Sequence, residues 1–193
     1  MTAIAVSPST ALRPALIGLG LTLVVAARWA ATVAFVADPV VIGLVFGSAL
    51  LSLGLAGGWR VGVPRVSSVA PGLAGAAVLV AIAALPRVGA DPHPTLAVAL
   101  APWAVATVLV ATAEEAVLRG ALFDTLTEHG GPVAAVLLTS AAFALMHVPL
   151  YGWHVVPLDV GVGLLFAGLR LLSGGIGAPV LAHAMADLAT YWL

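Results

Sequence analysis

The sequence is divided into long apolar segments, and this division constrains the possible fold more than any other feature. A helix crosses the hydrocarbon core of a bilayer with about 20 apolar residues. Seven segments approach this length: Pro14–Ala37, Val40–Gly57, Val69–Leu85, Thr95–Leu118, Pro132–Leu150, Val155–Leu172 and Ile176–Leu193. They are too long for barrel strands and lack the alternation of such strands, and lipid admits only helices or closed barrels. We therefore predict an all-α, polytopic transmembrane bundle of about seven helices, with residues 1–193 forming a single integral membrane domain.

The composition supports a lipid environment. Hydrophobic residues make up 62% of the chain and charged residues only 8%, whereas a soluble domain carries roughly 25% charged residues. Such a chain has too little polar surface to cover a core in water. Its net charge of −1 offers no basis for nucleic-acid binding, and the lack of cysteine excludes disulfides and thiol chemistry.

Arginine placement predicts the orientation in the membrane, because cytoplasmic loops carry an excess of basic residues. With a cytoplasmic N-terminus, most arginines fall at cytoplasmic helix ends, namely Arg13, Arg60, Arg65, Arg119 and Arg170. Only Arg87 falls outside, and Arg28 lies within the first segment. That segment resembles a signal peptide up to Ala27, but its apolar run resumes after Arg28, so we interpret it as an uncleaved helix. We expect a multi-pass protein of the inner or plasma membrane.

Turn and charge signals separate the apolar segments. They are Asp38-Pro39, Gly57-Gly58-Trp59-Arg60, Pro86-Arg87, Asp91-Pro92-His93-Pro94, His129-Gly130-Gly131-Pro132, Tyr151-Gly152-Trp153 and Ser173-Gly174-Gly175. We expect the polar side chains in or near these breaks to be solvated; these are His93, His129, His154, Asp124 and Glu128.

The stretch ATAEEAVLRGALF places three ionisable residues, Glu114, Glu115 and Arg119, inside an apolar run. An ionised side chain costs about 2.5–3.5 kcal/mol at the middle of a membrane helix, so these groups must face the bundle interior or a cavity. Glu115 and Arg119 are four residues apart on one helix face, in the favourable order for an ion pair. Glu114 is rotated by about 100° from Glu115 and needs a partner from another helix.

Two later segments supply such partners. His147 follows Phe143 by four residues in the fifth segment, and His183 and Asp187 are four residues apart in the last. Sites in helical bundles are built from side chains on facing helices. Taken singly, each group also has a purely structural interpretation: an ion pair for Glu115 and Arg119, a core histidine bound to a carbonyl for His147, or an interhelix clasp for His183. Arg28 and Asp159 have no partner that the sequence identifies.

Together, Glu114-Glu115-x-x-x-Arg119, Phe143-x-x-x-His147 and His183-x-x-x-Asp187 resemble the motifs of the CPBP family. This family comprises CAAX proteases and bacteriocin-processing (Abi) proteins and includes the type II CAAX prenyl endopeptidases, which are intramembrane endopeptidases. The resemblance covers about residues 100–193 and implies that Glu114 activates water and that His147 helps to position or deprotonate it. It further implies that His183 and the residue four positions later bind the oxyanion, with Glu115 and Arg119 supporting the site. The cavity is expected to open to the cytoplasm.

One position departs from the family pattern, because the third motif usually ends in asparagine and here ends in Asp187. An ionised aspartate accepts hydrogen bonds and cannot donate one to an oxyanion. Asp187 could instead be protonated, orient His183, or ligate a metal. Zinc is the metal that Glu114, His147, His183 and Asp187 could hold; a metal-free mechanism is equally compatible with the sequence and is the one we favour.

Three functions are weighed against one another. The first is an endopeptidase acting near the membrane surface on a peptide or protein, prenylated or not. The second is a non-catalytic scaffold or bacteriocin self-immunity protein of the same fold. The third is a small proton-coupled transporter, which should show an inverted repeat; the sequence shows none.

Overall fold

Within the described residues 12–34, 38–63, 65–85 and 99–193 of this computed structural model, every regular element is a helix. Seven α-helices carry the labels α2 (Arg13–Ala34), α3 (Pro39–Ala56), α4 (Val69–Ala84), α5 (Leu100–Glu115), α6 (Phe123–Tyr151), α7 (Val156–Ser173) and α8 (Gly177–Ala189). The remaining elements are two short 3₁₀ helices, η1 (Val66–Ser68) and η4 (Trp153–Val155), and a π-helix, η3 (Ala116–Leu122), which joins α5 to α6. The predicted all-α class is confirmed.

Five helical stretches of the described chain are long and apolar enough to cross a membrane. They are Arg13–Ala34, Pro39–Ala56, Val66–Ala84, Leu100–Tyr151 and Trp153–Ser173. The fourth stretch contains two of the predicted segments, and the last predicted segment appears as α8, which has only 13 residues. The integral membrane character follows from these helices, and the count of seven crossings stays a prediction.

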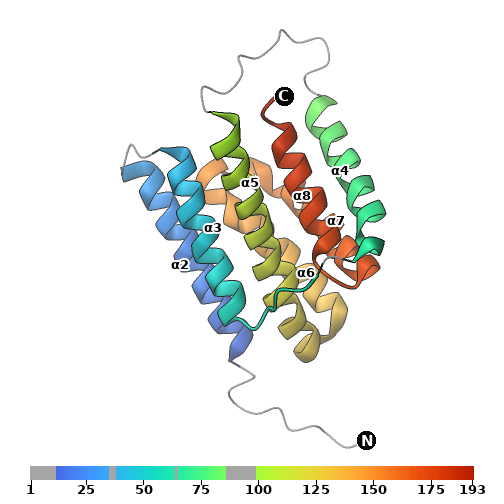
Figure 1. The fold of residues 1–193 in the computed structure, drawn as a ribbon. Coiled ribbons are helices and arrows are strands. Elements are labelled where there is room, and N and C mark those ends of the chain that lie inside the picture. Colours follow the sequence, from blue (N-terminus) through green and yellow to red (C-terminus); the bar gives the residue numbers. More distant parts are fainter. Residues whose placement is uncertain (1–11, 35–37, 64, 86–98) are drawn as a thin grey trace, which may run out of the picture.

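The predicted turn signals end helices where the structure describes them. Asp38 begins α3 by accepting a hydrogen bond from the Val40 amide at 2.7 Å. Gly131 adopts φ 79° within α6, where the chain turns back (Figure 1), and Gly174 ends α7 in the left-handed conformation that glycine favours. Some predicted turn positions lie outside the described residues: Pro86, Arg87, Asp91, Pro92, His93 and Pro94.

Arginines gather at one end of the bundle, here called the arginine end. Arg13 lies at the start of α2, Arg60 and Arg65 lie between α3 and α4, and Arg170 lies in the last turn of α7. Arg13 Nε donates to the Gly57 carbonyl at 3.1 Å, and Arg65 Nη1 donates to the Gly174 carbonyl at 3.1 Å. At the opposite end α2 and α4 finish, α3 and α5 begin, and α8 reaches the C-terminus (Figure 1).

Apolar side chains cover the outside of the bundle. Large exposed examples occur on five of the helices: Leu16, Leu23, Val45, Leu73, Val133 and Leu172. A soluble protein rarely exposes so extensive an apolar surface. In contrast, the largest fully buried side chain is that of Arg119. Apolar groups therefore face outwards to lipid while charged groups lie inside.

Helices α6 and α7 pack closely where α7 presents a glycine. A Cβ atom added at Gly163 would lie 2.8 Å from the Ser140 Cα atom, a separation that real structures do not tolerate. Small residues at such contacts let helix backbones approach in membranes. The Gly163 carbonyl also accepts a hydrogen bond from Arg119 Nη2 at 3.0 Å, so this contact helps to position the interior charges.

We predict that Gly163→Ala lowers the stability of the bundle by about 1–3 kcal/mol, because the methyl group forces α6 and α7 apart. The matched control is Gly161→Ala, two residues away on the same helix, where an added Cβ meets no atom within 4 Å. Thermal unfolding in detergent should show a lower melting temperature for Gly163→Ala only. Equal melting temperatures for the two variants would contradict this packing account.

Candidate active site

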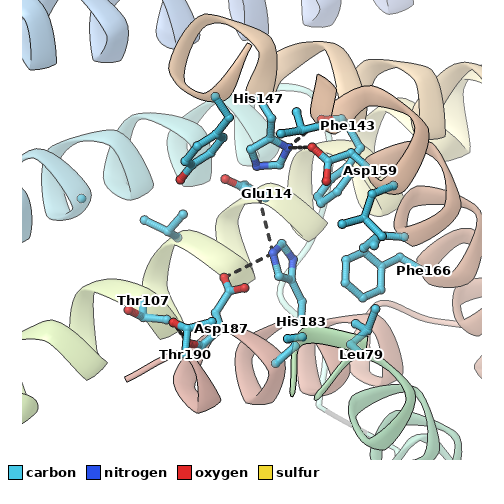
Figure 2. Close-up of a pocket in the computed structure, with 18 of the residues that line it drawn as sticks. Leu79, Thr107, Glu114, Phe143, His147, Asp159, Phe166, His183, Asp187 and Thr190 are labelled. Carbon is cyan, nitrogen blue, oxygen red and sulfur yellow. Dashed lines mark hydrogen bonds and ion pairs between the residues drawn. The ribbon is translucent and has the colours of Figure 1, made fainter. Parts of the chain in front are cut away.

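Glu114 lies at the base of a cavity inside the bundle. Its side chain is only 2% exposed, and the cavity has a volume of about 670 Å³. All seven labelled α-helices contribute lining residues, among them His147 from α6 and His183 from α8. In the view of Figure 2, the Glu114 carboxyl group lies between these two imidazole rings. The predicted convergence of three segments on one site is therefore present in the fold.

Glu115 and Arg119 form a fully buried ion pair next to this cavity. Arg119 Nη1 donates to Glu115 Oε1 at 3.0 Å, and neither side chain is exposed to solvent. The arginine Cζ atom also lies 4.9 Å from the centre of the Phe143 ring and 5.2 Å from that of Phe166. These cation–π contacts add to the hydrogen bonds that hold the guanidinium in place.

The pair spans a change in helix type. Glu115 is the last residue of α5, and Arg119 lies within the π-helix η3. Single turns of π-helix are rare and occur frequently at functional sites. On the outer side of this segment, the Trp59 indole occupies the space beside Gly120 that a Cβ atom would need. The spacing of Glu115 and Arg119 predicts that they share one helix face, but it does not predict the π-helix.

His183 connects the ion pair to Glu114. Its Nδ1 atom lies 3.1 Å from Glu115 Oε1, and its Nε2 atom lies 3.8 Å from Glu114 Oε2 and 3.4 Å from Asp187 Oδ2. The imidazole also stacks on Phe166, with ring centres 4.8 Å apart. Phe166 was not predicted as a site residue; nothing separates it from other apolar residues in the sequence.

His147 is held by its own helix and by α7. Its Nδ1 atom lies 3.0 Å from the Phe143 carbonyl and 3.3 Å from Asp159 Oδ2. A carbonyl oxygen only accepts hydrogen bonds, so Nδ1 carries the proton and the neutral ring leaves Nε2 as an acceptor. Asp159, which had no partner in the sequence analysis, is thus the carboxylate beside His147. The sequence holds a signal that Asp159 has a role inside the bundle, because a carboxylate in an apolar segment needs a polar partner.

The remaining polar residues lie apart from this group. Asp124, with a side chain 55% exposed, pairs with Arg170 at 2.9 Å, and Glu128 and His154 are exposed, as predicted. His129 is exposed as well, and its Nδ1 atom contacts the Thr125 carbonyl. His93 lies outside the described residues. Arg28 was unexplained; it lines the cavity, and its guanidinium lies 4.3 Å from the centre of the Phe46 ring.

The four residues considered as zinc ligands share the cavity, but they do not converge as a metal site. No group of three or more His, Asp or Glu side chains in the described parts of the chain is arranged to hold a metal ion. His147 faces Asp159, whereas His183 faces Glu114, Glu115 and Asp187. The metal-free chemistry favoured from the sequence stays a prediction, with zinc as its alternative.

The cavity lies in the half of the bundle away from the arginine end, and its expected opening to the cytoplasm stays a prediction. Its lining includes residues at the end of α6 and the start of α3, Tyr151 and Val40. Exposure rises from 2% at Glu114 to 43% for the Asp187 side chain and 55% at Tyr151. On the arginine side, every residue of η3 is buried and closes the cavity.

We predict that Glu115→Gln destabilises the protein by about 3–5 kcal/mol, because it leaves the buried Arg119 without a countercharge. The matched control is Asp124→Asn, which breaks the exposed pair with Arg170 and should cost less than about 1 kcal/mol. Thermal unfolding of both variants in detergent checks the contrast. If Glu115→Gln melts as the control does, the buried pair does not support the site.

Comparison with known families supplies independent evidence. Residues 95–189 match the family model described as type II CAAX prenyl endopeptidase Rce1-like. The matched range contains every residue of the three motifs quoted above. No curated protein and no solved structure matches the chain. The resemblance predicted from the motifs is thus confirmed, because residues 95–189 are similar to the Rce1-like family of type II CAAX prenyl endopeptidases.

Proposed function

We propose that this protein is an intramembrane endopeptidase that hydrolyses a peptide bond near the membrane surface, using water activated by Glu114 and His147. The observation that carries the proposal is the position of Glu114. Its carboxyl group is buried at the base of a cavity lined by two histidines from other helices. The match of residues 95–189 to the Rce1-like family supports CAAX-type protease activity, and the residue roles are inferred from the contacts described above.

In the proposed mechanism, a water molecule in the cavity is the nucleophile. Glu114 accepts one proton from this water, and His147 Nε2 accepts a hydrogen bond from it, because Nδ1 is held by Phe143 and Asp159. The water oxygen bonds to the substrate carbonyl carbon, which becomes tetrahedral. Glu114 then returns its proton to the leaving amine as the C–N bond breaks. The second water proton stays on the attacking oxygen, so the products are a carboxylic acid and an amine, which become a carboxylate and an ammonium group once this proton is exchanged.

His183 is the proposed donor to the oxyanion. Its Nδ1 faces Glu115 and its Nε2 faces the cavity side of Glu114 and Asp187. In the imidazolium form both nitrogens donate, and the three surrounding carboxyl groups supply the countercharge. A donor aimed at the developing oxyanion is commonly worth 10²–10³-fold in rate. Asp187, half-exposed and 3.4 Å from Nε2, serves to position His183 and does not contact the oxyanion in this proposal.

The buried ion pair fixes these groups relative to one another. Glu115 contacts both Arg119 and His183 through the same oxygen, Oε1. Arg119 in turn packs against Phe143 and Phe166, which contact the two imidazole rings. Precise placement of catalytic groups in this way contributes to rate because it removes the entropy cost of alignment.

The proposed substrate is a peptide or protein segment at the membrane. Carboxyl and imidazole side chains lie at the bottom of the cavity, and Leu79, Val110 and Val162 form apolar walls. An extended, partly apolar segment fits such walls. Prenylation of the substrate is one version of this proposal, and the first experiment therefore compares prenylated and plain peptides.

Replacing the proposed base tests the function directly. We predict that Glu114→Gln lowers kcat for peptide cleavage by about 10²–10⁴-fold, because an amide cannot accept the proton. The purified protein in detergent is assayed against prenylated and plain fluorogenic peptides, each with and without a strong chelator to test zinc. The matched control is Glu128→Gln, which changes an exposed glutamate and should leave cleavage unchanged.

Two outcomes of that assay would contradict the proposal. An active Glu114→Gln protein would show that another group activates water. A cellular phenotype that survives Glu114→Gln, with no cleavage by the wild type, would favour the scaffold or self-immunity function over catalysis.

Substitutions of Asp187 distinguish whether its side chain positions His183 or donates a hydrogen bond to the oxyanion. We predict that Asp187→Asn keeps most of the cleavage rate, since its amide oxygen still accepts from His183, whereas Asp187→Ala loses rate mainly in kcat. Steady-state kinetics on the same peptide measure kcat and KM for both variants. Equal activity of Asp187→Ala and the wild type would show that Asp187 has no role in positioning His183.

A further inference from the structure

The outer face of the bundle carries a second hollow, here called the α2–α3 groove. Helices α2 and α3 lie side by side (Figure 1), and the groove between them has a volume of about 340 Å³. We propose that this groove binds an anionic phospholipid, with an acyl chain along the groove and the phosphate on Arg28. The proposal does not rest on the proposed cleavage reaction, because its test measures lipid binding.

Small side chains leave the space between the two helices open. Ala27 and Ala31 line the groove from α2, and Ala49 lines it from α3. Towards the arginine end the helices pack closely instead, because a Cβ atom added at Gly20 would lie only 2.6 Å from Leu53 Cδ1. The groove therefore ends inside the bilayer and extends from there towards the opposite end of the bundle.

The rim of the groove belongs to the lipid-facing surface. Leu23 on α2 and Val41 and Val45 on α3 line the groove and are exposed. In a membrane, the molecules that reach such side chains carry hydrocarbon chains. The apolar walls therefore fit the acyl chain of a lipid.

Arg28 is the only ionisable residue among the described residues that line the groove. Its guanidinium lies 4.3 Å from the centre of the Phe46 ring, and it forms no ion pair or hydrogen bond within the described part of the chain. Charged side chains in membrane helices are costly and usually have partners. The five N–H donors of a guanidinium match the oxygens of a phosphate group. A lipid phosphate supplies the partner that Arg28 lacks among the described residues.

The position of Arg28 along α2 corresponds to the level of lipid headgroups. It lies less than two turns before Ala34, the last residue of α2, or about 9 Å along the helix axis. Long arginine side chains near helix ends extend to the membrane interface. The neighbouring Trp29 is exposed, and tryptophan concentrates at this interface. A lipid can therefore place its phosphate on Arg28 and its acyl chain beside Leu23.

The charges around Arg28 favour an anionic lipid over a zwitterionic one. The acidic residues Glu114, Asp159 and Asp187 line the neighbouring cavity, to which Arg28 also contributes, but they do not line the groove. In a zwitterionic lipid the headgroup ammonium offsets the charge of the phosphate. An anionic phospholipid keeps this charge, so it binds Arg28 more strongly.

Native mass spectrometry of the purified protein tests the phosphate contact, with phosphatidylglycerol and phosphatidylcholine of identical acyl chains as the probes. We expect the wild type to bind phosphatidylglycerol more tightly. Arg28→Gln should weaken this binding by about fivefold, the effect of one basic residue near an anionic lipid, whereas Arg28→Lys should keep most of it. Equal binding of the two lipids by the wild type overturns the proposal.

The matched control is Arg60→Gln, which removes an exposed arginine at the arginine end and should leave lipid binding unchanged. An equal loss in Arg28→Gln and Arg60→Gln contradicts the proposal, because it reports total charge and not a site. Phosphatidylglycerol binding by Arg28→Gln that is as tight as by the wild type does so as well.

Ala49→Leu tests the groove while Arg28 stays in place. The larger side chain fills the space that the acyl chain needs, so we expect weaker binding of phosphatidylglycerol. Glycerophosphoglycerol, which has the headgroup but no acyl chain, should not displace the lipid from the wild type. Displacement by this fragment, or unchanged binding by Ala49→Leu, rules out the groove as the site. An uncharged isoprenoid alcohol that binds the wild type and Arg28→Gln alike, and more tightly than phosphatidylglycerol, overturns the proposal too.

Thermal unfolding provides a second readout of the same site. A ligand that binds only the folded protein stabilises it, so phosphatidylglycerol should raise the melting temperature of the wild type and Arg60→Gln more than that of Arg28→Gln. An equal rise in all three proteins contradicts the proposal. If Arg28→Gln does not fold, Arg28→Lys and Ala49→Leu still decide it. No arm measures cleavage, so the proposed endopeptidase activity and this lipid site can fail independently.

Discussion

The buried contact between Glu115 and Arg119 is the interaction on which the rest of the site depends. Lipid offers no partner to either group, so the pair must be satisfied inside the bundle. Arg119 reaches Glu115 at 3.0 Å and the Gly163 carbonyl on α7 at 3.0 Å, and Glu115 reaches His183 on α8 at 3.1 Å. One ion pair thus links α5, η3, α7 and α8. The close approach of α6 and α7 at Gly163 and Ser140 brings the Gly163 carbonyl within reach.

This linkage gives the two acidic residues different roles although they are adjacent in the chain. Glu115 points to the packed interior and holds His183, whereas Glu114 points into the cavity, where a water molecule and a substrate can reach it. The two histidines also have different neighbours. His147 is oriented through Nδ1 by Phe143 and Asp159, and His183 is surrounded by Glu114, Glu115 and Asp187. These contacts support the proposed division into residues that hold the site together and residues that react.

Much of this arrangement could be predicted from local spacing. A separation of four residues fixed the Glu115–Arg119 pair, and the cost of charge in lipid required Glu114, His147 and His183 to find partners from other helices. The features that could not be predicted depend on packing between distant segments. Asp159 meets His147 only because α6 and α7 lie side by side, and Phe166 stacks on His183 only because α7 contacts α8. The π-helix and the direction of the cavity likewise arise from how the helices fill the interior. The sequence likewise gives no sign that residues 116–122, which follow Glu114 and Glu115, are all buried.

In the proposed mechanism, water activated by Glu114 and His147 attacks a peptide carbonyl, and His183 stabilises the oxyanion. A peptide aldehyde tests it most directly, because its hydrate resembles the tetrahedral intermediate and needs no turnover. An experimentally determined structure of the protein with this inhibitor should place the hydrate at the base of the cavity. One hydrate oxygen should lie within hydrogen-bond distance of the Glu114 carboxyl group and the other within hydrogen-bond distance of His183 Nε2. A hydrate bound away from Glu114 would contradict the account.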